Sequence, residues 1–348
     1  MKRILPLLLV VSLLFSLCSC VADPPAPRDV VLSQHTAAQA EYLAGKYEAF
    51  SRYATGKAEL SRPLPIMLAV SSPAVFAEIS EAASFSDSFR VPVKSGEAAV
   101  YNLKVGARYY WRPIDEAGVP LGEAESFRTE PIAPRNLFLD GVTNARDLGG
   151  WQTADGPIRQ GMIYRTAKYN ANQSAELLIT EEGIRQANEV LGIRTEIDLR
   201  TVADNENGGI TQSPLGASVR YISFPMEYGG NLLIINKDLF ADLFRIFAEE
   251  ENYPIAFHCS IGADRTGVVA FLLNALLGAS EEDLYRDYLF SNFGEIDGMR
   301  SASAIRNYFS MISGASGNTI AEQTYSYLLS IGVAAQDLDA FLAIMKTA

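Results

Sequence analysis

Apolar residues in the first third of the chain come in short runs separated by turn residues. Runs of this length and spacing between residues 28 and 130 predict β-strands and indicate a small all-β sandwich domain. The segment 36–53 has a more helical or irregular pattern and does not fit such a strand. The expected strands are Ile66–Val70, Phe89–Val93, Ala99–Leu103, Arg108–Ile114 and Ala124–Thr129.

From residue 131 to residue 348 strand-like and helix-like patterns alternate. Apolar positions in residues 237–250 fall on one helical face, and the apolar helix expected at 268–277 ends at Gly278. This alternation predicts an α/β domain with a central, mostly parallel sheet flanked by helices. The expected strands are Gly192–Arg200, Val219–Phe224 and Tyr253–Cys259.

Residues 1–20 have the pattern of an export signal, with two basic residues before the apolar run Ile4–Leu17. The run is short for a membrane span of about 20 residues. The run is followed by Cys20 in a sequence that resembles a bacterial lipobox. This resemblance implies a lipoprotein whose Cys20 carries acyl chains, including palmitate. The alternative is an ordinary cleaved signal. Residues 21–27 form a Pro-containing linker. We therefore expect an exported protein, anchored to a bacterial membrane at the cell surface or facing the periplasm, that contacts the membrane only through this lipid.

Composition narrows the function. The 348 residues carry a net charge of −12, which argues against binding nucleic acid by charge attraction. Three cysteines and two histidines argue against a disulfide scaffold and against a Cys-rich or His-rich metal site. Residues 131–348 hold 16 Lys and Arg against 27 Asp and Glu, a net charge of −11. Such a surface suits a phosphorylated protein side chain or a small phosphomonoester, bound by a local group of arginines, better than an anionic lipid.

The segment from His258 to Gly267 lies between a predicted strand and a predicted helix. Backbone N–H groups in such a loop, at a helix N-terminus, can hold a phosphate dianion. Cys259 begins the loop, and both the helix end and Arg265 favour its thiolate, a good phosphoryl acceptor. Arg265 can also hold two phosphate oxygens at once. The further residues expected to contact phosphate are Ser260, Ile261, Gly262, Ala263 and Thr266, whose hydroxyl could also donate to the sulfur.

The string His-Cys-x-x-Gly-x-x-Arg-Thr-Gly resembles the signature of the cysteine-dependent protein tyrosine phosphatase superfamily. A narrower resemblance is to the bacterial tyrosine/serine protein phosphatase family. It implies a tyrosine-phosphatase-like fold and the hydrolysis of phosphotyrosine, with phosphoserine and phosphothreonine as further substrates. The reaction would pass through a cysteinyl-phosphate intermediate and need no cofactor or metal. It covers most of residues 137–348 and is carried, besides the loop, by Thr143–Gly150, Thr153–Gly156, Ile163–Thr166, Gly192–Arg200 and Asp287–Asn292.

The resemblance also implies an acid that protonates the leaving oxygen. No Trp-Pro-Asp sequence is present to supply it. Asp264, inside the loop, is the first candidate, and Asp198, at the end of a predicted strand, is the second. Each has a structural alternative: Asp264 could be an acceptor that stabilises the loop, and Asp198 could pair with Arg200 or Arg265.

Residues of the flanking motifs have supporting roles in this interpretation. His258 is expected to order the loop by hydrogen bonding. The resemblance places Arg146 and Arg165 near the pocket rim, where they would bind phosphate. The alternative is mutual ion pairing that packs this segment against the sheet, and we favour it for Asp147 and Arg200.

Three other functions stay open. The chain could be a phosphate-recognising binding module with degraded catalysis. It could be a phosphoinositide or inositol phosphate phosphatase, although Ala263 replaces the lysine that several such relatives carry. It could also be a sulfur-transfer or arsenate-reducing thiol enzyme, against which the closing Arg-Thr-Gly stands. Within the β domain, residues 101–129 resemble the last strands of a fibronectin type III module, which could hold the catalytic domain off the membrane or bind an unknown surface partner.

Overall fold

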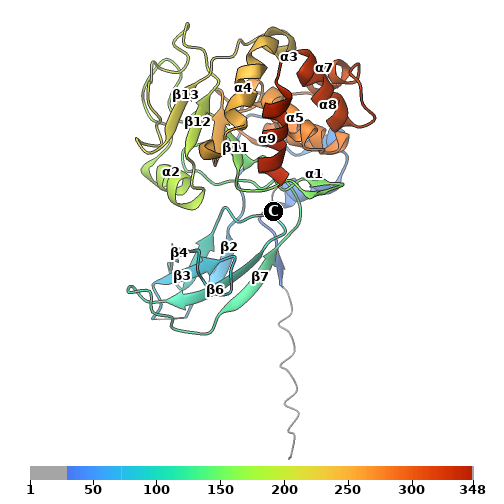
Figure 1. Cartoon of the computed structure of the whole chain (residues 1–348). Coiled ribbons are helices and arrows are strands. Elements are labelled where there is room, and N and C mark those ends of the chain that lie inside the picture. Colours follow the sequence, from blue (N-terminus) through green and yellow to red (C-terminus); the bar gives the residue numbers. More distant parts are fainter. Residues whose placement is uncertain (1–29, 72, 347–348) are drawn as a thin grey trace, which may run out of the picture.

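The computed structural model describes residues 30–71 and 73–346, which form a small β body and a larger α/β body (Figure 1). The predicted export signal, its Cys20 and the linker lie outside the described residues. Within the described ranges no helix has the length and apolar character that a membrane crossing requires.

The β body is a sandwich of two sheets, as the pattern predicts. One sheet has the strand order β1-β7-β6-β3-β4, and the other pairs β2 with β5. All five expected strands are confirmed to within a few residues. The two-residue strand β1 and the longer β3 were missed. In β3 Glu78 interrupts the apolar run, and its carboxylate is paired with Arg112 at 2.7 Å. The fibronectin type III resemblance stays a prediction. The strands are β1 Val31–Leu32, β2 Ile66–Ala69, β3 Phe76–Ser80, β4 Ser88–Pro92, β5 Glu97–Val100, β6 Arg108–Ile114 and β7 Glu125–Thr129.

The α/β body is built on a five-stranded sheet in the order β13-β12-β14-β11-β8. Four strands are parallel, and β8 pairs antiparallel with β11 at one edge. The predicted mostly parallel sheet is therefore confirmed, and β12, β13 and β14 are the three expected strands. The strands are β8 Arg146–Asp147, β11 Ile163–Thr166, β12 Thr195–Asp198, β13 Arg220–Ser223 and β14 Ile255–His258, and a small hairpin joins β9 Gln152–Thr153 to β10 Gly156–Pro157.

Helices cover both faces of this sheet (Figure 1). The helix expected near 268–277 is confirmed, and Gly278 follows it with a positive φ of 89°. The helices are α1 Ala37–Ala44, α2 Glu181–Arg185, α3 Leu232–Ile235, α4 Phe240–Phe247, α5 Arg265–Leu276, α6 Glu281–Phe290, α7 Ser303–Ile312, α8 Ile320–Ser330 and α9 Ala335–Lys346. The short helical turns are η1 Tyr47–Arg52, η2 Gln186–Val190, η3 Lys237–Leu239, η4 Glu250–Asn252 and η5 Ser291–Phe293.

Alternating side chains of the central strand separate two hydrophobic cores. Ile255 and Phe257 of β14 pack into the core shared with α4 to α9, whereas Ala256 faces the core on the α2 side. This is the period-two alternation of a strand that is buried on both faces. The sheet is thus held rigidly from both sides, which fixes the positions of the strand ends.

The segment 37–61 belongs structurally to the α/β body, although the sequence places it in the β region. Tyr42, Leu43 and Phe50 are buried in the same core as α5 and α6. Farther on, the Gly56 N–H donates to the Asn292 carbonyl at 2.8 Å. The apolar positions of this segment are too irregular in sequence to reveal this docking.

Candidate active site

The ends of three parallel strands bring distant residues together at one edge of the sheet. In register, His258 at the end of β14 lies between Asp198 of β12 and Thr166 of β11. Crevices at the carboxyl ends of parallel strands are the usual binding sites of such sheets. Cys259 is the next residue after β14 and enters this crevice.

The loop from Cys259 to Asp264 turns its carbonyl groups back into the protein. The Ser260 oxygen accepts from the Lys168 N–H at 3.4 Å, the Ile261 oxygen from the Asn144 side chain at 3.1 Å, and the Gly262 oxygen from Arg165 at 2.9 Å. Within the described part of the chain, the N–H groups of residues 260–264 donate no hydrogen bond. The loop therefore has the anion-binding polarity predicted from its sequence.

Gly262 is required for this conformation. Its φ is +69°, and a Cβ there would lie 2.5 Å from the Thr166 carbonyl oxygen. Any side chain would push the loop away from β11, so the turn predicted at this glycine is a close contact between backbones.

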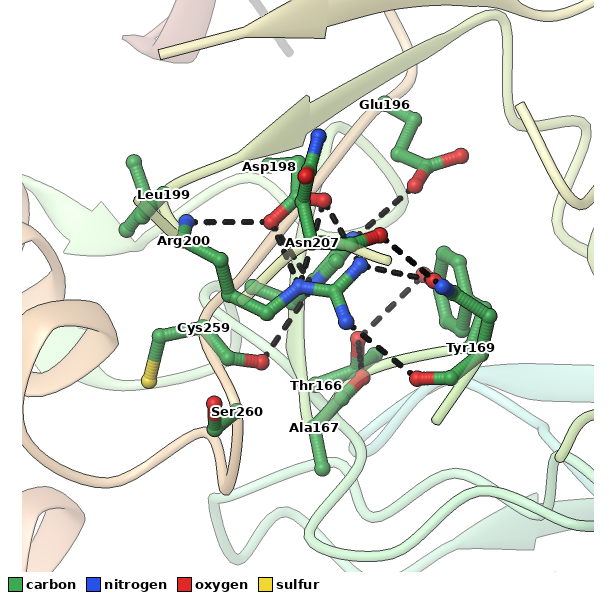
Figure 2. Close-up of polar contacts among 12 residues, drawn as sticks. Thr166, Ala167, Tyr169, Glu196, Asp198, Leu199, Arg200, Asn207, Cys259 and Ser260 are labelled. Atoms are coloured by element: carbon green, nitrogen blue, oxygen red, sulfur yellow. Dashed lines mark hydrogen bonds and ion pairs between the residues drawn. The ribbon is translucent and has the colours of Figure 1, made fainter. Parts of the chain in front are cut away.

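Cys259 is a free, buried thiol, 2% exposed, that lines a pocket of about 630 Å³. Ser260, Ile261 and Arg265 line the same pocket, whereas Gly262, Ala263 and Thr266 are buried below it. The Thr266 hydroxyl has no hydrogen-bond partner among the described residues, so the expected donation to the sulfur is not seen. Figure 2 shows the Cys259 sulfur pointing away from the buried Asp198–Arg200 pair.

Arg265 is buried and oriented by Glu206, a residue that the sequence did not single out. The two carboxylate oxygens of Glu206 accept from the Arg265 Nη1 and Nη2 atoms at 2.7 and 2.5 Å. Burial alone would raise the pKa of Glu206, but hydrogen bonds from Arg265 and Ser260 outweigh it and lower that pKa to about 2. The Arg265 Nε is buried and has no partner among the described residues. Glu206 therefore fixes one edge of the guanidinium and leaves the Nε edge for a ligand.

Arg146 and Arg165 do not reach the pocket, contrary to their predicted role in phosphate binding. Both are essentially unexposed and share the carboxylate of Asp287, at 2.8 and 2.5 Å. Burial and the neighbouring charge of Arg146 lower the pKa of Arg165 to about 10. The alternative of mutual ion pairing is what the structure shows, and it holds the loop from behind through Gly262. Asp147, for which we favoured pairing, is paired with Arg135 at 2.8 Å.

His258 orders the loop within a second buried network. Its Nε2 lies 2.9 Å from Glu196, and its Nδ1 lies 3.3 Å from the Cys259 carbonyl oxygen. Asp198 has no exposed surface and pairs with Arg200 at 2.7 Å (Figure 2). Burial would raise the pKa of Asp198, but the charge of His258 and the bonds from Arg200 outweigh it and lower that pKa.

Glu196, Asp198 and His258 also place three atoms that can bind a metal, two carboxylate oxygens and one imidazole nitrogen, within 4.8 Å of one another. Each of these groups is engaged by a protein partner, including Ser213, which donates to Glu196 at 2.5 Å. The guanidinium of Arg200 lies against Asp198, where it competes with any cation. We therefore describe this cluster as a structural hydrogen-bond network.

Asp264 lies at the pocket, 9% exposed, but its carboxylate is bound by Arg300. The Arg300 Nε and Nη2 atoms donate to its two oxygens at 2.8 and 2.9 Å. The alternative of a structural role for Asp264 thus has a specific partner. Arg300 lies beyond α6, so no local sequence pattern indicates that it pairs with Asp264.

A second hollow of about 640 Å³ continues from the pocket past Ser260 and Ile261. Lys168 lines it, and Lys57 from the docked N-terminal segment lies on its rim. The hollow beside the pocket is therefore formed in part by a residue that precedes the phosphatase-like region 137–348.

Comparison with known proteins agrees with this geometry. The model of a family described as "Tyrosine phosphatase family" matches residues 137–346. This chain belongs to the tyrosine phosphatase family. The match begins after the β body, and it includes the loop from Cys259 to Arg265 and the strands that position it.

Two curated relatives carry related names. A provisionally named tyrosine-protein phosphatase of Cupriavidus necator is 28% identical over 182 residues, which are 45% of this chain and 63% of that protein. A tyrosine-protein phosphatase of Nostoc commune is 29% identical over 143 residues, which are 34% of this chain and 47% of that protein. The chain thus spans about half to three-fifths of the length of these relatives.

Solved structures give a weaker likeness. The crystal structure of TpbA from P. aeruginosa has 18% identity and a TM-score of 0.31, covering 52% of this chain and 96% of its own. The catalytic core of the PP-IP phosphatase SIW14 from S. cerevisiae has 16% identity and a TM-score of 0.28, covering 46% and 93%. At these TM-scores the likeness supports no conclusion about the site.

Proposed function

We propose that this chain is a cysteine-dependent phosphomonoester hydrolase that acts on phosphotyrosine in proteins through a cysteinyl-phosphate intermediate. The observation that carries the proposal is the orientation of the loop around Cys259. Successive carbonyls are bound from behind, the N–H groups of residues 260–264 have no protein acceptor in the described chain, and the buried Arg265 Nε is without a partner. These are the donors that a phosphoryl group bound at a thiolate requires.

Tyr228 supports phosphotyrosine as the preferred substrate. Tyr228 is 63% exposed and lines the pocket, and the centre of its ring lies 5.4 Å from the Arg265 Cζ. An exposed ring beside the phosphate site can pack against the phenyl ring of phosphotyrosine, which phosphoserine lacks.

Turnover by the purified full chain tests this proposal. We expect hydrolysis of p-nitrophenyl phosphate and of a phosphotyrosine peptide, slower hydrolysis of phosphoserine and phosphothreonine peptides, inhibition by vanadate, and no effect of EDTA. Cys259→Ser should abolish turnover while phosphopeptide binding persists. Retained activity in that variant would contradict the thiolate mechanism, and a preference for inositol phosphates would contradict the substrate class.

A binding module with degraded catalysis is the second candidate, because both acids predicted from the sequence are bound by arginines. It predicts phosphopeptide binding by the wild-type chain without turnover. The turnover assay above separates the two functions directly.

The proposal extends to location. The export signal and the lipobox-like ending at Cys20 support a chain that is anchored by lipid to the outer or periplasmic side of a bacterial membrane, with the β body free to bind a surface partner. Labelling with a palmitate analogue in the native host should mark the wild type and not Cys20→Ala. Equal labelling of both would contradict the anchor.

A further inference from the structure

Five carboxylates line the pocket that contains Cys259, and they differ in what binds them. They are Asp204, Glu206, Glu227, Asp264 and Asp297. A general acid must lie in the pocket with a side chain that is free to give a proton to the leaving oxygen and to take one up again in the second step. A carboxylate that an arginine holds through both oxygens cannot approach a leaving group without breaking that ion pair.

This requirement removes two of the five. Glu206 receives two bonds from Arg265, and Asp264 receives two from Arg300. Asp198, the other acid expected from the sequence, is fully buried against Arg200 and does not line the pocket. The remaining candidates are Asp204, Glu227 and Asp297, whose side chains have no polar partner within the described residues.

The backbone of Glu227 is fixed, whereas its side chain is free. Its N–H donates to the Asn236 Oδ1 at 2.8 Å, and its carbonyl accepts from the Asn236 Nδ2 at 3.1 Å. Asn236 is itself buried, 1% exposed. The side chain of Glu227 is exposed in the pocket, so its backbone is anchored while no ion pair within the described residues holds its carboxylate.

Both neighbours of Glu227 contact the arginine of the loop. The Met226 carbonyl accepts from the Arg265 Nη1 at 3.4 Å, and the Tyr228 ring lies over the same guanidinium. In the described chain, the residues next to Asp204 and Asp297 make no contact of this kind. The segment 226–228 therefore lies against the arginine of the phosphate-binding loop, and Glu227, in its middle, lines the same pocket as Cys259.

We propose that Glu227 is the general acid and base of the reaction, and that Asn236 is its positioning residue. The inference rests on the proposed function. In the first step the Cys259 sulfur forms a bond to phosphorus, the bond from phosphorus to the leaving oxygen breaks, and the Glu227 proton goes to that oxygen. In the second step Glu227, now a carboxylate, takes a proton from water while the water oxygen bonds to phosphorus. The S–P bond breaks with its electron pair returning to sulfur, which gives phosphate, a thiolate and protonated Glu227.

The test measures leaving-group dependence in the full chain with aryl phosphates of graded phenol acidity and one alkyl phosphate. Glu227→Gln should slow the alkyl phosphate by about 10²-fold or more and the most acidic phenol much less, because a good leaving group needs little protonation. Asn236→Ala should show the same trend in kcat with a smaller loss. Glu251→Gln, an exposed glutamate outside the pocket, is the matched control and should match the wild type.

Several results would overturn the assignment. Equal losses of Glu227→Gln on all leaving groups, or no loss, would exclude Glu227 as the acid. Leaving-group dependence in Asp204→Asn, Asp264→Asn or Asp297→Asn instead would identify the true donor. If the wild type turns over and Cys259→Ser does not, these outcomes reject only the role of Glu227; a wild type without turnover rejects the proposed function as well.

Discussion

The two sides of the phosphate-binding loop are built differently. Behind the loop, the charged groups are buried and paired, as the shared Asp287 of Arg146 and Arg165 shows. In front of it, the loop N–H groups, the Arg265 Nε and the Glu227 carboxylate have no partner in the described chain. Polar residues behind the loop are thus bound by protein partners, whereas several of those in front are left open to a ligand, even where the sequence motif contains both.

Changing the front should remove activity without unfolding the protein. Arg265→Lys keeps a charge but loses the planar pair of donors. We expect kcat/KM for p-nitrophenyl phosphate to fall by about 10³-fold, with a thermal unfolding midpoint lowered by only a few degrees because the pair with Glu206 is weakened. A variant that keeps more than a tenth of the wild-type kcat/KM would show that Arg265 does not bind the phosphoryl group.

Substitutions behind the loop should instead lower the stability of the fold. Asp287→Ala leaves Arg146 and Arg165 buried without their carboxylate, so we expect a loss of about 3–5 kcal/mol in the free energy of unfolding, measured by urea denaturation. Asp242→Ala, which removes the exposed partner of Arg245, is the control and should cost under about 1 kcal/mol. Equal, small losses in both variants would remove the distinction between the two sides.

Segment 37–61, like the charged groups behind the loop, should contribute to the stability of the fold. Leu43 is 7% exposed and packs in the core of the α/β body. Leu43→Ala should lower the free energy of unfolding by about 2–3 kcal/mol. Val119→Ala, on an exposed turn of the β body, should change it by less than about 0.5 kcal/mol. If the two variants are equally stable in denaturation, segment 37–61 is not part of that core.

Glu206 lies between the two sides and should show the smallest effect. Its pKa is lowered in the folded state, so its stabilisation is present above the ordinary pKa of about 4.3 and is lost as pH falls toward 2. At pH 7 we expect Glu206→Gln to be less stable than the wild type by about 1 kcal/mol. Unfolding midpoints measured from pH 7 to pH 2 should converge at the acid end. A gap that stays constant, or widens in acid, would contradict the ion pair with Arg265.

Sequence patterns predicted those elements of the fold and of the site that are formed by contiguous residues. The strand from Tyr253 to Cys259, the helix after it and the loop between them follow from apolar runs and a contiguous motif. Register then explains why Asp198 lies beside His258.

The other features of the site depend on which distant parts of the chain meet in the folded protein. Arg146 and Arg165 carry no local sign of whether they face the pocket or its back, and the partners Glu206 and Arg300 reach Arg265 and Asp264 from separate loops. Glu227 follows an ordinary strand, β13, and only its place in the pocket and the contacts of its neighbours with Arg265 distinguish it from other surface glutamates. An irregular segment such as 37–61 likewise gives no signal for the surface on which it packs.

The central claim is that Cys259 accepts the phosphoryl group. Rapid acid quenching of the full chain during turnover of p-nitrophenyl phosphate, followed by peptide mass spectrometry, tests it most directly. We expect one phosphoryl group on the peptide that contains Cys259, more of it in Glu227→Gln for the most acidic leaving group, and none in vanadate-treated enzyme. Active enzyme that never carries a phosphoryl group on Cys259, or carries it on another residue, would contradict the account.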